Sequence, residues 1–90
     1  IMKIKVKQMT SSRSGNPVPN QFIIYTGEGN YFQSYDSVIV ANNSGKITLD
    51  NNTWDYSSTT GKYRNEFLGE GIAETRAKIE SGEYTLANLN

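Results

Sequence analysis

The residues with the most chemical potential lie at positions 54–70, in the segment WDYSSTTGKYRNEFLGE. Ser58 and Lys62 stand four residues apart, which would place a hydroxyl nucleophile and an amine base on one helical face. The same spacing fits a helix-capping serine followed by a solvated lysine, and we favour this structural interpretation. The chain has no cysteine and no histidine, which removes thiol nucleophiles, imidazole bases and zinc sites built from them. We therefore predict a protein that is not an enzyme and that uses no cofactor.

Two further patterns in the chain resemble ligand-binding loops, one for calcium and one for phosphate, but each lacks a feature that such a loop needs. The spacing of positions 1, 3, 5 and 12 in an EF-hand calcium loop is matched by Asp55, Ser57, Thr59 and Glu66. Thr60 occupies the position that needs glycine, and no helix is expected before the loop, so we interpret the match as chance. The GEGN run at residues 27–30 joins two predicted strands, and no helix N-terminus follows it to hold a phosphate. No metal site is predicted.

Two groups of residues are candidates for binding. Lys3, Lys5 and Lys7 alternate along one predicted strand, which places their ammonium groups on one face about 6–7 Å apart. With Arg13 in the following loop they could contact phosphates or an acidic protein surface, or they could protect an edge strand from aggregation. The second group consists of Tyr56, Lys62 and Arg64, of which the tyrosine and the arginine are of the types that dominate protein interfaces.

Length and charge limit the classes of function. Ninety residues make one small domain, which we expect to span residues 1–90. Nine basic residues balance nine acidic ones, so neither a strongly basic nucleic-acid binder nor an acidic DNA mimic is indicated. No apolar run reaches membrane-spanning length, and no basic region followed by an apolar core opens the chain. We expect a cytoplasmic protein without a membrane partner.

Hydropathy patterning predicts that the sheet precedes the helices. Met2, Ile4 and Val6 alternate with lysines as in a half-buried strand, and residues 10–20 form a loop rich in small polar residues and proline. Strands follow at residues 21–26, 31–35, 37–41 and 46–49, separated by the GEGN turn, a kink or bulge at residues 36–37, and a turn at residues 43–45. This order predicts an antiparallel meander of four to five strands.

Two short helices are predicted after the meander. The first spans residues 59–68, with Ser57 or Ser58 as its cap, Tyr63 and Phe67 on its buried face, and Gly69 past its end. The second spans residues 72–80, where the spacing pairs Glu74 with Lys78, and Gly82 ends it. Trp54 is expected to clamp the first helix onto the sheet, and Tyr35 and Tyr63 are expected in the core. Residues 83–89 can return as an edge strand. The fold class is therefore α+β.

The chain also resembles a known group of proteins. The runs YFQSYDSVI, LDNNTWDYSSTTGKYRNEFLGE and ETRAKIESGEYTLANLN resemble small uncharacterised proteins of bacteriophages and prophages, and WDYS-x-TT-x-KYR-x-x-FLGE is the specific part. The resemblance runs from about residue 20 to residue 90 and carries no catalytic residue with it. It implies a bacterial host cell, in which small phage proteins often bind and block host proteins, including defence nucleases such as CRISPR effectors.

Three hypotheses of function remain open from the sequence. The leading one is a non-enzymatic phage-encoded module that blocks a host protein, most concretely as an anti-CRISPR or other anti-defence inhibitor. The alternative is a nucleic-acid-binding accessory protein that uses a lysine and aromatic sheet face. The third is a structural or dimerising phage component. The sequence identifies neither the partner nor the oligomeric state.

Overall fold

The computed structural model describes residues 3–90, so the predicted burial of Met2 lies outside the described residues. Its elements, in chain order, are β1 (Lys5–Thr10), β2 (Pro17–Tyr25), β3 (Asn30–Ser34), β4 (Ser37–Asn43), β5 (Lys46–Asp50), α1 (Ser58–Leu68), α2 (Ile72–Ser81) and β6 (Thr85–Ala87). The strands form one sheet in the order β1-β2-β3-β4-β5-β6. The first five pair antiparallel, whereas β6 returns after the helices and pairs parallel with β5. The predicted α+β fold, with a meander followed by two helices, is confirmed.

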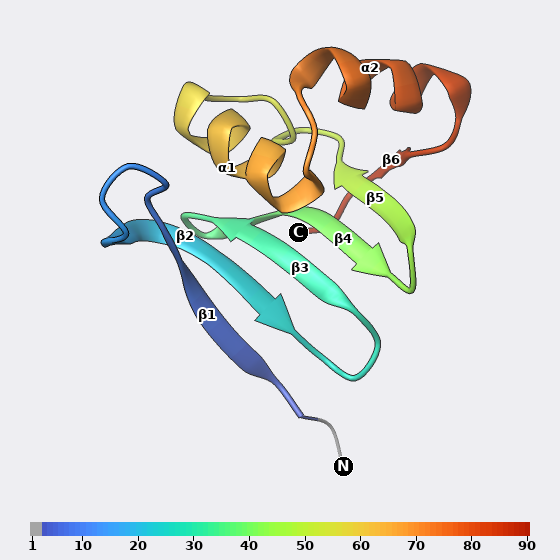
Figure 1. Ribbon diagram of the computed structural model, residues 1–90. Coiled ribbons are helices and arrows are strands. Elements are labelled where there is room, and N and C mark those ends of the chain that lie inside the picture. Colours follow the sequence, from blue (N-terminus) through green and yellow to red (C-terminus); the bar gives the residue numbers. More distant parts are fainter. Residues whose placement is uncertain (1–2) are drawn as a thin grey trace.

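Both helices lie on one side of the sheet (Figure 1). Cross-strand partners share a face, and the row that continues through Ile23, Phe32, Val40 and Leu49 faces the helices. Phe32 is fully buried and its ring stacks on that of Phe67 in α1, with the centroids 5.9 Å apart. In the part of the chain that the structure describes, the opposite face of the sheet carries no helix.

Local signals set the bounds of α1. Ser57 has an extended backbone, and its hydroxyl accepts a hydrogen bond from the Thr60 N–H at 3.1 Å, as a helix N-cap does. Gly69 ends the helix in the left-handed region, with φ 71°. Tyr63 is buried in the core, and Trp54 and Phe67 are partly buried against it. The predicted cap, the helix end at Gly69 and the burial of Tyr63 are confirmed.

The first hairpin differs from the prediction in two ways. β2 begins at Pro17, inside the predicted loop, because the prolines suit extended backbone and partly buried Val18 packs against the core. Ile4 and Val6 were expected to be half-buried, yet 61 % and 59 % of their surfaces are exposed. They lie on the sheet face that the helices leave open, whereas Met9 is the buried residue of β1.

The predicted kink at residues 36–37 is a hairpin turn. Residues 35 and 36 connect β3 to β4, and the two strands pair with each other. The irregularity in strand pairing lies farther from this turn, where the register of β3 with β4 shifts between Phe32 and Gln33. Tyr35 makes the turn with φ 57°. This left-handed conformation is usually adopted by glycine or asparagine, so a tyrosine does not signal such a turn in the sequence.

Candidate functional site

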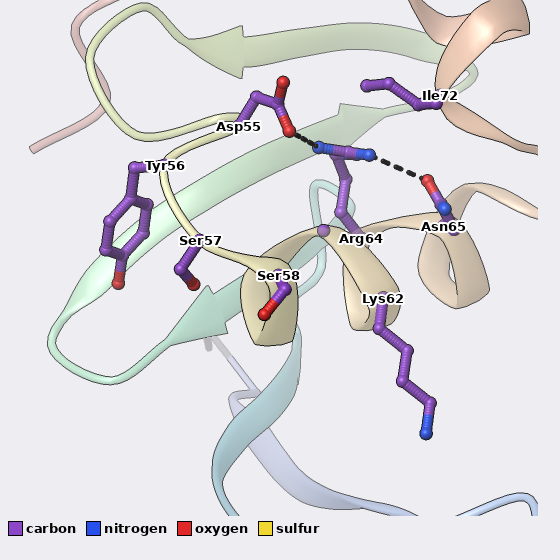
Figure 2. A pocket seen from close by; sticks show the side chains of 9 residues that line it. Asp55, Tyr56, Ser57, Ser58, Lys62, Arg64, Asn65 and Ile72 are labelled. Atoms are coloured by element: carbon purple, nitrogen blue, oxygen red, sulfur yellow. Dashed lines mark hydrogen bonds and ion pairs between the residues drawn. The ribbon is translucent and has the colours of Figure 1, made fainter.

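An open surface hollow lies where the chain leaves the sheet and enters α1 (Figure 2). Its volume is about 630 Å³. It is lined by Asp55, Tyr56, Ser57, Ser58, Gly61, Lys62, Arg64, Asn65 and Ile72. The hollow thus brings together Tyr56, Lys62 and Arg64, the second of the two predicted binding groups.

Arg64 forms the base of this site. The sequence suggested a surface contact, but only 1 % of the residue is exposed. Its Nη1 donates to the Trp54 carbonyl at 2.7 Å and to Asp55 Oδ1 at 3.1 Å, and its Nη2 donates to Asn65 Oδ1 at 2.9 Å. Gly61 leaves room for the guanidinium, since a Cβ there would lie 3.6 Å from Nη2. Arg64 therefore holds the wall of the hollow in place and is not accessible as an anchor.

A second arginine completes this cluster. Arg76 Nη2 in α2 donates to Asp55 Oδ2 at 2.8 Å, so one carboxylate joins both arginines. Each guanidinium carbon also lies over the Trp54 ring, at 5.5 Å for Arg64 and 5.4 Å for Arg76. The cluster ties the segment before α1 to both helices. Its two guanidinium groups and one carboxylate leave it with one net positive charge.

Glu70 forms a polar centre between α1 and α2. Only 4 % of the Glu70 side chain is exposed, and its carboxylate accepts hydrogen bonds from Lys78 Nζ at 2.6 Å, Thr75 Oγ1 at 2.7 Å and the Tyr84 hydroxyl at 3.0 Å. Burial alone would raise the pKa of Glu70, but these bonds together hold that pKa below its ordinary value. Lys78 was expected to pair with Glu74 in its own helix. It pairs with Glu70 instead, because the chain folds back between the helices.

Asp50 forms a similar centre at the end of β5. Its Oδ2 accepts from the N–H groups of Asn52 and Thr53 and from the Thr53 hydroxyl, and its Oδ1 accepts from the Leu89 N–H at 2.9 Å. Burial acts to raise the pKa of Asp50, but the hydrogen bonds outweigh it and lower that pKa. No sequence signal pointed to Glu70, whose partners lie five to fourteen residues along the chain. Asp50 bonds mainly to Asn52 and Thr53 in its own turn, and only the Leu89 N–H comes from a distant segment. Both carboxylates are occupied in stabilising the fold.

Tyr56 and Tyr35 are the exposed aromatic residues near the hollow. Their exposed fractions are 48 % and 47 %. The Ser34 and Thr60 hydroxyls are 2.8 Å apart, which joins the end of β3, next to Tyr35, to the first turn of α1. Figure 2 shows Lys62 extending away from Ser58, and none of the hydrogen bonds found within residues 3–90 joins the two. The arrangement offers aromatic surface, hydroxyls and one exposed amine.

The lysine group lies elsewhere. Lys3, Lys5, Lys7 and Arg13 are exposed on the first hairpin at the edge of the sheet, and none of them lines the hollow. Lys7 shares a face with Ile23 and Phe32, whereas partly exposed Phe22 and Tyr31 belong to rows of the opposite face. The structure therefore separates the two predicted binding groups, and it sets the lysines and these aromatic residues on different faces.

Fold and site define a small α+β domain whose six-stranded sheet carries two helices on one face and a polar hollow at the entry to the first helix. The chain belongs to DUF8033, a family of unknown function, whose family model matches residues 4–84. No curated protein and no solved structure gives a significant match. Within residues 3–90, no helix is long and apolar enough to cross a membrane, and no group of three or more acidic side chains is placed to hold a metal ion.

Proposed function

We propose that the chain is a non-enzymatic binding module that blocks a host protein, with Tyr35 and Tyr56 as its anchors. Given the phage setting that the sequence resemblance implies, the most concrete partner is a bacterial defence nuclease such as a CRISPR effector. Small binding domains act by burying a few aromatic anchors in a partner, surrounded by polar contacts. Ser57, Ser58 and Lys62 supply such a polar rim beside Tyr56.

The backbone of Tyr35 is the observation that supports this proposal. A left-handed conformation costs a residue with a Cβ about 1–2 kcal/mol, and a bulky residue rarely adopts it. Here two hydrogen bonds hold it: the Tyr35 N–H donates to the Asn20 carbonyl at 2.7 Å, and Gln33 Nε2 donates to the Tyr35 carbonyl at 2.8 Å. The fold thus maintains a strained turn that presents an aromatic ring to solvent, and strain of this kind is found at functional positions.

A comparison of matched variants tests the proposal. The Y35S/Y56S double variant removes both rings, and L86S removes an exposed apolar side chain on β6 as the control. Thermal melts first establish that each variant folds. The wild type and L86S should retain the same host protein from a bacterial lysate. Once that host protein is purified, it should bind Y35S/Y56S at least about tenfold more weakly than the wild type, as expected for the loss of two interface anchors.

A cellular assay tests the anti-defence version. In cells with an active CRISPR system, expression of the wild type should restore transformation by a targeted plasmid, and Y35S/Y56S should not. If host proteins are retained equally by the wild type and Y35S/Y56S, the two tyrosines are not anchors and the proposal fails. If a tyrosine-dependent partner is found but interference is unchanged, only the CRISPR version fails.

A further inference from the structure

Within residues 3–90, no strand pairs with the outer edge of β1. β1 is first in the strand order and pairs only with β2, through Lys5 to Tyr25, Val6 to Ile24, Lys7 to Ile23 and Gln8 to Phe22. Every second residue of an edge strand therefore presents a free N–H and a free carbonyl to solvent. Such an edge can accept a further strand by main-chain hydrogen bonds, and side chains then determine which strand fits.

The side chains of this edge are sorted by chemistry onto two faces. Lys5 and Lys7 occupy one face of β1, and Val6 occupies the other with 59 % of its surface exposed. Ile4, just before the strand, is 61 % exposed. Lysines alone are enough to protect an edge strand from aggregation. Protection does not account for exposed branched aliphatic residues between them, which are a liability at an edge unless something covers them.

Charge is also concentrated at this edge. The stretch 3–25 holds Lys3, Lys5, Lys7 and Arg13 and no acidic residue. None of the three ion pairs found within residues 3–90 involves it. Across the whole chain, residues 1–50 carry five basic and three acidic side chains, and residues 51–90 carry four basic and six acidic. Zero net charge therefore conceals a basic edge that has no ion-pair partner among residues 3–90.

We propose that β1 binds an extended protein segment in which acidic residues alternate with apolar ones, and that this segment adds to the sheet as a seventh strand. Cross-strand neighbours share a face, so the acidic side chains lie beside Lys5 and Lys7 and the apolar ones beside Val6. The inference rests on the proposed function in that the partner is a protein, but it concerns a surface separate from Tyr35 and Tyr56.

A second copy of the chain is a poor occupant for this edge. When two copies of β1 pair antiparallel in one sheet, the lysines of both copies line the same face. Like charges placed opposite each other destabilise strand pairing. The alternation therefore favours a partner of opposite charge over self-association.

Synthetic peptides test the inference directly. The first probe is a short labelled peptide in which glutamate alternates with valine. Its controls are an isomer with the same residues in two blocks and a version N-methylated at every second amide. We expect the alternating peptide to bind the full chain at least about tenfold more tightly than either control, because only it can supply both the side-chain pattern and the backbone donors. Equal affinity for the isomer would overturn the proposal, because charge alone would then explain the binding.

Charge reversal in the protein supplies the second test. K5E/K7E should weaken the alternating glutamate peptide at least about tenfold and should bind a lysine and valine peptide of the same pattern. K46E, an equivalent reversal at the exposed start of β5, should change neither affinity. If a single-stranded oligonucleotide binds more tightly than the peptide and depends on Lys5 and Lys7, the lysines contact phosphates and the strand proposal is wrong.

The outcome is independent of the first proposal. Y35S/Y56S should bind the alternating peptide as the wild type does, because the tyrosines lie outside β1. If the peptide fails while tyrosine-dependent capture of a host protein persists, only the strand addition is refuted. If the peptide binds while that capture fails, the tyrosine anchors are refuted and the edge remains.

Discussion

Substitution of Glu70 by glutamine should destabilise the fold through one defined network. The change retains size and one acceptor oxygen, but it removes the charge and places an amide N–H₂ where an oxygen accepts hydrogen bonds. The two carboxylate oxygens receive three donors, from Lys78, Thr75 and Tyr84, and only 4 % of the side chain is exposed. At least one of these donors therefore loses its acceptor in E70Q.

The size of the effect follows from the burial of the two partners. A hydrogen bond to a charged group contributes about 1.5–3 kcal/mol. Lys78 keeps 34 % of its side chain exposed, so water can replace part of its interaction. We therefore expect a loss of about 2 kcal/mol, which corresponds to a fall in Tm of roughly 8–16 °C for a domain of this size.

Thermal and urea unfolding at neutral pH, with E74Q as the control, measure this loss. Glu74 lies in the first turn of α2, is exposed and forms no ion pair within the described residues. E74Q should change stability by less than about 0.5 kcal/mol. If E70Q and E74Q unfold at the same temperature, the Glu70 network contributes nothing and the reasoning is wrong.

The pH dependence of E70Q gives a second check. The folded state lowers the pKa of Glu70, so its contribution is present above the ordinary pKa and is lost as pH falls through the lowered one. The stability gap between the wild type and E70Q should therefore shrink in acid, below about pH 4.5. The Glu70 hydrogen bond raises the pKa of Lys78, so the gap should persist into mildly alkaline solution. A gap that is constant down to pH 3 would contradict the assignment.

Three further substitutions test other parts of the structure by the same unfolding measurements. G61A should stabilise the protein by about 0.5–1 kcal/mol, because Gly61 is helical and a Cβ there would make an ordinary contact with Arg64; destabilisation would mean that the guanidinium packs more tightly than its 3.6 Å distance indicates. Q21M should stabilise by about 1 kcal/mol, since Gln21 is fully buried and neither of its amide atoms has a partner within residues 3–90; a loss of stability would reveal a hidden hydrogen bond. D50N should cost about 1–3 kcal/mol at neutral pH, because its amide would face groups that all donate, and the cost should fall below pH 3.8 as Asp50 of the wild type is protonated.

The sequence predicted those features that depend on neighbours in the chain. The cap at Ser57 and the end of α1 at Gly69 follow from side chains and backbone within a few residues. Tyr63 was placed in the core because helical spacing sets it on one face with Phe67. Tyr56 and Lys62 were grouped because both belong to the short segment that enters α1, and both line the hollow.

The features that the sequence missed depend on contacts across the fold. Arg64 carries no local mark of burial, because its partners include Trp54 and Asp55, which a turn brings back onto α1. Lys78 has two acidic residues within reach, and only the path of the chain between the helices selects Glu70. The alternation in β1 predicted a buried face, but it could not show which face the helices cover.

The opposite charges of the two halves of the chain have a consequence for the kinetics of association. A molecule with no net charge is attracted only weakly at long range. Charges of opposite sign on its two halves nevertheless give it a dipole moment, which orients it as it approaches a charged partner. The basic β1 edge would then lead toward a negatively charged surface while the more acidic helical half trails. Orientation of this kind raises the association rate more than it lowers the dissociation rate, and it weakens as salt is added.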